Sequence, residues 1–390
     1  MLVLPIASVS SVTFSDDAHC PQRHMANREC TCTSTEIKCR FRNLQNVPTF
    51  LLSPWPFKRL DLSQNNISII PARAFENINV TEIDLSENDL RVFDELAFSH
   101  LEGQLLKLDL RDNSLSEVPG VLKKLNKLSL LDVSYNPIGE NNFTNEVMRQ
   151  IGDTLIEFRF GDPELRHWPS SLHHFPELQI LKFFGGKMDR IPISAFNGFE
   201  YTLRKLWMQN TSLIAVPIAL QHLHNCDELH FDNNLNVSDA GILIPAFAGM
   251  VNSLKTLSLE NNQLTTFPPV LRTLRQLANL SLAHNNLQIV SDQAISEVSS
   301  NLTTLNLQSC NLDRVPGALS RITHLRNLDF TNNFITTIEK NDFQNMRSLV
   351  SLNISHNPVE YISKSTFHDL TSLTEMIING SKLYEVSLCL

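Results

Sequence analysis

The sequence predicts an α/β solenoid, a stack of short coils that each contribute one strand to a long parallel sheet. The first observation is a ladder, Leu-x-x-Leu-x-Leu-x-x-Asn-x-Leu, which recurs along almost the whole chain, as in Leu60–Ile67 and Leu257–Leu264. The second is its spacing, because fourteen copies between Phe57 and Leu383 follow one another at steps of 23 to 28 residues. A single coil cannot bury its leucines, but stacked coils bury them in one continuous core.

Each ladder copy indicates a short strand, because strand side chains point alternately to two faces. One polar position per copy points inward with the leucines, and an amide there can hydrogen-bond the backbone where neighbouring coils turn. This position is occupied in turn by Asn65, Asn88, Asn113, Asn136, Pro163, Gly186, Thr211, Asn234, Asn262, Asn285, Cys310, Asn333, Asn357 and Ser381. The three residues least like asparagine, Pro163, Gly186 and Thr211, are consecutive.

The outer sides of the coils are of two kinds. Five coils of 23 residues read Pro-x-x-Leu-x-x-Leu, as at Pro119, whereas several longer coils contain Ala-Phe, as at Ala97. Proline stops strand pairing, and the leucines after it should pack a short helical or extended segment. Two long coils, around Gly139–Gly152 and Asn236–Ser253, should add a loop or helical turn. Because the sheet side and the outer side of each coil should differ in thickness, the stack should curve. We therefore expect a horseshoe with a concave parallel sheet of about 14–15 short strands and an irregular or short-helical convex side.

Composition excludes several classes of function. The net charge of −9 and the pI of about 5.8 argue against a nucleic-acid partner, which would require a basic face. The sequence contains no run of eighteen apolar residues, so it predicts no membrane span in this chain. The sequence contains no nucleophile elbow, zinc-protease motif, phosphate-binding loop or dinucleotide fingerprint. We therefore expect a protein that is not an enzyme and that needs no cofactor or metal.

Four of the seven cysteines lie near the start of the chain, at Cys20, Cys30, Cys32 and Cys39. Together with the ladder, this run resembles the N-terminal cysteine cap of the extracellular leucine-rich repeat superfamily, which includes Toll-like, chaoptin-like and Slit-like ectodomains and small leucine-rich proteoglycans. The resemblance implies the disulfides Cys20–Cys32 and Cys30–Cys39. A cap covers the core and the sheet edge that the first coil would otherwise expose. The alternative is a four-cysteine zinc site, for which this spacing is poor.

The chain should therefore comprise three segments. Residues 1–19 read as a weak or truncated leader, residues 20–50 as the disulfide cap with a first repeat-like strand, and residues 51–390 as about 14 repeats without a C-terminal cysteine cap. Cys226 and Cys310 should be buried free thiols, because three coils would separate them by ~14 Å. Cys389 has no obvious partner.

Nine Asn-x-Ser/Thr sequons, considered together with the cap, predict an extracellular or cell-surface protein. They lie at Asn66, Asn79, Asn142, Asn210, Asn236, Asn279, Asn301, Asn353 and Asn379. Four of these should lie on or beside outward strand positions, namely Asn210, Asn279, Asn353 and Asn379. Glycans there would cover the C-terminal half of the concave face and leave repeats five to eight open.

The central outward strand positions define the expected concave face. They are Asp61, Asp84, Asp109, Asp132, Arg159, Lys182, Trp207, His230, Ser258, Ser281, Asn306, Asp329, Asn353 and Ile377. The four leading aspartates could indicate a calcium or polybasic site, but solvated repeat residues are the stronger interpretation.

The middle of this row departs from the repeat pattern. Aromatic and charged residues together are typical of protein-interface hot spots, and functional sites tend to fall where a local pattern fails. The candidate ligand-binding residues are Arg159, Lys182, Phe184, Arg204, Lys205, Trp207, Glu228, His230 and Asp232, with Glu157 beside them. Degeneration of the repeat without a function is the alternative interpretation.

The sequence thus predicts a non-enzymatic extracellular module that binds a protein or glycan on its concave face, of the receptor or adhesion type. The alternative is a secreted matrix scaffold or a non-catalytic subunit of a secreted complex. The chain could also form a homodimer.

Overall fold

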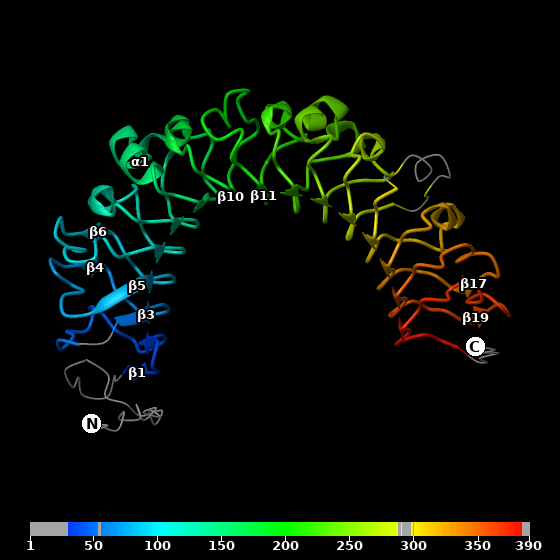
Figure 1. Ribbon diagram of the computed structural model, residues 1–390, viewed down its shortest axis with the longest axis horizontal. Helices are drawn as coiled ribbons and strands as arrows, with labels where there is room; N and C mark the ends of the chain where they lie inside the picture. The colour runs from blue at the N-terminus through cyan, green and yellow to red at the C-terminus, as the bar shows by residue number, and fades with distance from the viewer. Residues whose placement is uncertain (1–29, 54–55, 288–289, 291–297, 299, 384–390) are drawn as a thin grey trace, which may run out of the picture. The chain divides into compact units, whose positions relative to one another are not determined.

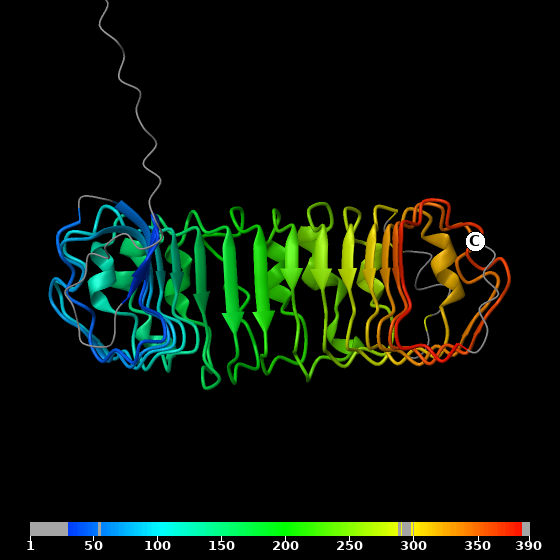
Figure 2. The same ribbon diagram turned by 90° about the horizontal axis from the view of Figure 1, so that it is seen from below.

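The computed structural model describes residues 30–53, 56–287, 290, 298 and 300–383. The expected leader at residues 1–19, Cys20 and Cys389 lie outside these ranges. The chain divides into two compact units, the first made of Met1–Leu115 and Pro119–Asp132 and the second of Ser116–Val118 and Val133–Leu390. Each unit is a stack of coils with a parallel sheet along one side (Figures 1 and 2).

The first unit begins with the cap. Its sheet strands are β1 (Thr31–Cys32), β2 (Glu36–Lys38), β3 (Pro56–Asp61), β5 (Asn79–Asp84), β7 (Lys107–Asp109) and β8 (Leu130–Asp132), with β4 (Ile69–Ile70) and β6 (Val92–Phe93) as a separate pair. β1 pairs antiparallel with β2, which pairs parallel with β3 so that Ile37 lies beside Leu60. The cap therefore supplies the first repeat-like strand. Cys30 is disulfide-bonded to Cys39, and Cys32 also forms a disulfide.

The second unit continues the same pattern over more coils. Its sheet strands are β9 (Glu157–Phe160), β10 (Ile180–Phe184), β11 (Lys205–Gln209), β12 (Glu228–His230), β13 (Thr256–Ser258), β14 (Asn279–Ser281), β15 (Thr304–Asn306), β16 (Asn327–Asp329), β18 (Ser351–Asn353) and β20 (Glu375–Ile377), with β17 (Thr337–Ile338) and β19 (Tyr361–Ile362) as a separate pair. These ten strands and the five parallel strands of the first unit agree with the expected 14–15. In this unit the strands line the inside of the curve (Figure 1).

Short helices form the outer side of the proline coils, which is one of the two forms, helical or extended, that the proline pattern predicts. The five 3-10 helices in the proline coils are η1 (Gly120–Lys124), η3 (Ser170–His174), η4 (Ile218–His222), η7 (Pro269–Arg272) and η8 (Gly317–Arg321). Each is preceded by a proline with extended ψ. The two long coils add η2 (Glu140–Asn142) and α1 (Asn145–Gly152), and η5 (Asp239–Gly241) and η6 (Ile244–Met250). None of the helices in the described ranges is long and apolar enough to cross a bilayer.

The ladder asparagines join successive coils, and Asn65 shows how. Its side-chain Nδ2 donates to the carbonyls of Cys39 and Leu62, both at 2.9 Å, and its Oδ1 accepts from the N–H groups of Arg42 and Leu44 at 2.9 and 3.0 Å. One buried amide thus satisfies backbone groups of two coils. The same donation to the preceding coil is made by Asn88, Asn113, Asn234, Asn262, Asn285, Asn333 and Asn357.

In two of the coils that lack a ladder asparagine, glycines allow the backbones of neighbouring coils to approach closely. A Cβ added at Gly161 would lie 1.9 Å from the Phe184 carbonyl oxygen, and one at Gly186 would lie 2.9 Å from that of Leu165. The backbones of these neighbouring coils therefore approach too closely for a side chain. Elsewhere, the Cys310 thiol donates to the Leu282 carbonyl at 3.2 Å.

The two remaining cysteines are buried free thiols, as expected. Burial raises the pKa of both Cys226 and Cys310 to about 12, so each stays protonated at physiological pH. A protonated, buried thiol is a poor nucleophile, so these two residues have a packing role.

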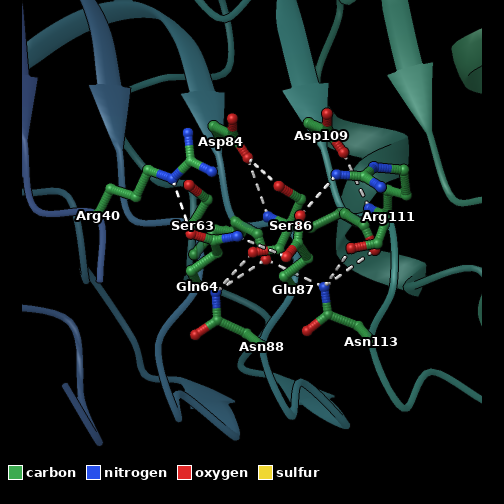
Figure 3. Close-up of polar contacts among 12 residues, drawn as sticks. Arg40, Ser63, Gln64, Asp84, Ser86, Glu87, Asn88, Asp109, Arg111 and Asn113 are labelled. Atoms are coloured by element: carbon green, nitrogen blue, oxygen red, sulfur yellow. Dashed lines mark hydrogen bonds and ion pairs between the residues drawn. The ribbon is translucent and has the colours of Figure 1, made fainter. Parts of the chain in front are cut away.

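Internal contacts hold the aspartate row of the first unit, and Figure 3 shows those of Asp84 with Ser86 and of Asp109 with Arg111. Asp61, Asp84, Asp109 and Asp132 are register partners on adjacent strands. Arg59 lies 2.6 Å from Asp84 and 3.7 Å from Asp61. No group of three or more acidic, histidine or cysteine side chains in the described ranges is arranged to hold a metal ion.

Asp109 differs from its neighbours in this row. Burial, reinforced by the charge of Asp132, raises the pKa of Asp109 to about 7, although its carboxylate accepts a hydrogen bond from the Arg111 N–H at 2.9 Å. Because the native pKa exceeds the unfolded value, the ionised carboxylate opposes folding above pH 7, and this cost disappears as the pH falls towards 4.

We therefore expect Asp109→Asn to raise the free energy of unfolding at pH 8 by about 1–2 kcal/mol, a value discounted for partial exposure. The gain should shrink at pH 5, as measured by urea unfolding at both values. Asp84→Asn is the matched control, because it loses the Arg59 ion pair and should not stabilise the chain. Destabilisation by Asp109→Asn at pH 8 would contradict the raised pKa of Asp109.

The core should respond to truncation wherever a ladder leucine is fully buried. Leu206 and Leu229 are both 0% exposed. Replacing either with alanine leaves a cavity and should cost ~2–5 kcal/mol in chemical denaturation. Gln276→Ala, at an exposed position of the same unit, should change stability little. A loss below ~1 kcal/mol at Leu206 would show that the coils collapse around the gap.

Candidate binding site on the strand face

The second unit places the predicted central positions in a single row. Arg159, Lys182, Trp207 and His230 are register partners on β9 to β12. The row then continues through Ser258, Ser281, Asn306, Asp329, Asn353 and Ile377. The leucines between these positions are buried, so the named side chains point out of the strand face.

Trp207 is held between its two neighbours in this row. The His230 ring stacks on the indole with centroids 4.8 Å apart and planes 5° apart, and the Lys182 ammonium lies 4.6 Å from the indole centroid. Because β10 and β12 flank β11 on opposite sides, each neighbour covers a different face of the ring. Stacking and cation–π attraction fix the half-buried indole.

Two glutamates pair with the cations around the indole. Glu157 lies 2.6 Å from Arg159 and 3.5 Å from Lys182, and Glu228 lies 2.7 Å from Lys205 and 2.9 Å from His230. These side chains are half-buried and come from four adjacent strands. The contacts hold the long side chains in place before any ligand arrives, which lowers the entropic cost of binding.

The pKa of His230 is raised from its ordinary value. Burial opposes the charged form, but hydrogen bonds and charges from Asp232 and Glu228 outweigh it. Asp232 is only 6% exposed, and its carboxylate accepts from the Ser258 hydroxyl at 2.6 Å and the Gln209 amide at 3.0 Å. Asp232 therefore positions His230 from two residues further along the chain and offers little surface of its own.

Arg204 is less integrated than its neighbours. It precedes β11, and its guanidinium contacts the carbonyl of Asn225 at 3.5 Å. None of its side-chain contacts in the described ranges joins it to the row around Trp207. We name the remaining candidate residues the central patch, which consists of Arg159, Lys182, Phe184, Lys205, Trp207, Glu228 and His230.

A second aromatic pair extends the central patch beyond what the sequence analysis identified. The rings of Tyr135 and Phe184 stack at 5.9 Å and 18°. Their coils lie on either side of Gly161, whose carbonyl accepts from the Tyr135 N–H at 2.7 Å and whose α-carbon abuts Phe184. Without a side chain at Gly161, the two rings can meet. A tyrosine directly before ladder residue Asn136 was the signal in the sequence, since other coils carry small or polar residues there.

The strand-face sequons remain candidates for glycosylation. Asn279 and Asn353 lie on β14 and β18 and are half-exposed, whereas Asn210 and Asn379 are exposed. All four belong to the second unit, so glycans at Asn279, Asn353 and Asn379 would lie C-terminal to the central patch.

Comparisons with known proteins agree with this architecture. Leucine-rich repeat family models match residues 78–138, 300–359 and 323–383, and a second such model matches residues 253–274. Mouse keratocan is 28% identical over 309 residues, which cover 72% of this chain and 76% of keratocan. Drosophila melanogaster chaoptin is 27% identical over 59% of this chain but only 17% of chaoptin. A solved leucine-rich repeat protein of Leptospira interrogans superposes with a TM-score of 0.60 at 21% identity, covering 86% of this chain and 94% of its own.

The repeat ladder, the capping disulfide and these relatives agree with one another. The chain is a leucine-rich repeat solenoid similar to extracellular members of that superfamily, and it is a secreted or cell-surface protein.

Proposed function

We propose that the chain is a non-enzymatic recognition module of the receptor or adhesion type, which binds a protein ligand through the central patch. The observation that carries this proposal is the fixed indole of Trp207 between Lys182 and His230. Interface hot spots are enriched in tryptophan, tyrosine and arginine, and they gain affinity when their side chains are ordered beforehand. The central patch has this composition and this order.

The contacts favour a protein over a glycan at this position. A sugar ring packs against an open aromatic face, and both faces of Trp207 are already covered. The indole Nε1–H is a donor, which suits a carbonyl or carboxylate of a protein partner. Around it, Glu157, Glu228 and their cations offer both signs of charge, which complementary charged groups on a partner can match.

A secreted scaffold is the second candidate function, and one observation favours it. The similarity to keratocan extends over 76% of that protein, whereas the similarity to chaoptin extends over 17% of that one. The central patch would then bind another secreted protein rather than act as part of a receptor.

The double variant Trp207→Ala with Arg159→Ala tests the proposal. We expect it to abolish capture of the ligand protein from culture medium, while the melting temperature stays close to that of the wild-type chain. Capture is measured by affinity purification and quantitative mass spectrometry against the wild-type protein. Tyr361→Ala with Lys364→Ala is the matched control, since these residues are exposed elsewhere on the same unit. Unchanged capture, or a large fall in melting temperature, would refute the role of the central patch.

His230 should make the order of the central patch depend on pH. Because its native pKa is raised, its contribution to stability is fully present below about pH 6.5 and is lost as the pH rises through the native value. We therefore expect His230→Ala to destabilise the chain more at pH 5.5 than at pH 8.5. Thermal unfolding at both values measures this difference, and an NMR titration should give His230 a midpoint above that of a free imidazole. A midpoint below it would contradict the assigned contacts with Glu228 and Asp232.

A further inference from the structure

A polar groove lies at the edge where the strands of the second unit end. Its volume is about 560 Å³, and its lining includes Asn261, Gln263, His284, Asn286, Ser309 and Asn311. These residues immediately precede or follow the ladder positions of three successive coils. We call this surface the edge groove. Its volume falls in the range of small-ligand sites.

The lining of the edge groove contains no aspartate, glutamate, lysine or arginine. Its principal groups are side-chain amides, each of which presents a donor and an acceptor together. Asn311 donates to Asn286 at 2.9 Å, so these two amides are held side by side. Gln263 and His284 are exposed and make no side-chain hydrogen bond to another described residue. Polar groups for an uncharged ligand are thus present and available.

Exposed apolar side chains occupy the equivalent places in the coils on either side of the edge groove, outside its lining. Leu235 and Phe334 follow the ladder asparagines of the coils beside the groove, and they are 56% and 60% exposed. Asn286 and Phe334 occupy equivalent places, since each N–H donates to the preceding coil, at Leu264 and Leu312. In five successive coils, the residue after the ladder position is therefore apolar Leu235, then the amides Gln263, Asn286 and Asn311, then apolar Phe334.

A peptide cannot add a strand at this edge through main-chain hydrogen bonds. The N–H groups of Asn261, His284 and Ser309 already donate to carbonyls of the next coil, at 2.9, 2.8 and 2.9 Å. A peptide that adds a strand needs unpaired donors and acceptors. An anion would need cations that the lining lacks, and an apolar ligand would need an apolar floor.

We propose that the edge groove binds a neutral oligosaccharide. The amides of Gln263 and Asn311 would hydrogen-bond sugar hydroxyls, and the exposed ring of Phe334 would pack against the apolar face of a pyranose. This site is separate from the central patch and does not depend on the proposed function.

The test is calorimetric titration of the enzymatically deglycosylated full chain with cellohexaose, maltohexaose and chitohexaose, with a heparin-derived hexasaccharide as the charged comparison. We expect one neutral hexasaccharide to bind in the millimolar range or tighter. Gln263→Ala with Asn311→Ala should weaken that binding by about tenfold, the effect of losing one or two hydrogen bonds. Gln344→Ala, at an exposed outer-side position, is the matched control and should leave binding unchanged.

Thermal melts of the variants establish that each is folded. Three results would overturn the proposal: none of the neutral hexasaccharides binds, the double variant binds as well as wild type, or the heparin fragment binds equally well. Trp207→Ala should not alter sugar binding, and loss of binding in that variant would move the sugar to the central patch. Failure of protein capture by the central patch would leave the edge groove unaffected.

Discussion

The hydrogen bonds of the ladder asparagines are the constraint on which the rest of the structure depends. Each coil turns at the end of its strand and leaves backbone groups that no strand partner can satisfy. At Asn65 one amide joins four such groups and crosses from one coil to the next. A buried group left unpaired costs about 1–3 kcal/mol, so the gain from one side chain is large. Repeated in coil after coil, this bond fixes the distance between coils and the register of the strands.

A fixed register turns the outward strand positions into continuous rows, and the rows carry the chemistry. In the first unit Arg59 pairs with Asp61 and Asp84, whereas in the second Lys182, Trp207 and His230 form a stacked cluster. The central patch lies where the ladder loses its asparagines. There the backbone at Gly161 abuts Phe184, and this close approach allows Phe184 to stack on Tyr135. The close approach at Gly161 thus builds part of the candidate site in a coil whose ladder position is Pro163.

Much of this could be predicted from the sequence, because the ladder has one period and one register. The ladder predicted the partners of Trp207 on the neighbouring strands. The prolines predicted the short helical or extended segments that follow them. The sequence could not predict the Tyr135–Phe184 pair, which depends on a missing side chain in the coil between them. Nor could it predict the burial of Asp232, because burial depends on the spacing of coils and not on the pattern within one.

The central patch and the edge groove differ in chemistry because they occupy different parts of the coil. Side chains on a strand stand side by side, so charges and rings there can pair in rows, as Glu157 does with Lys182. Residues beside the ladder asparagines must tolerate tight turns, and Asn261 and His284 adopt positive φ, which favours small polar side chains. In a solenoid each coil contacts only its neighbours, so a change at Gln263 should barely reach Trp207. One chain of this fold can therefore carry a charged, aromatic surface and an uncharged, amide-rich one without either constraining the other.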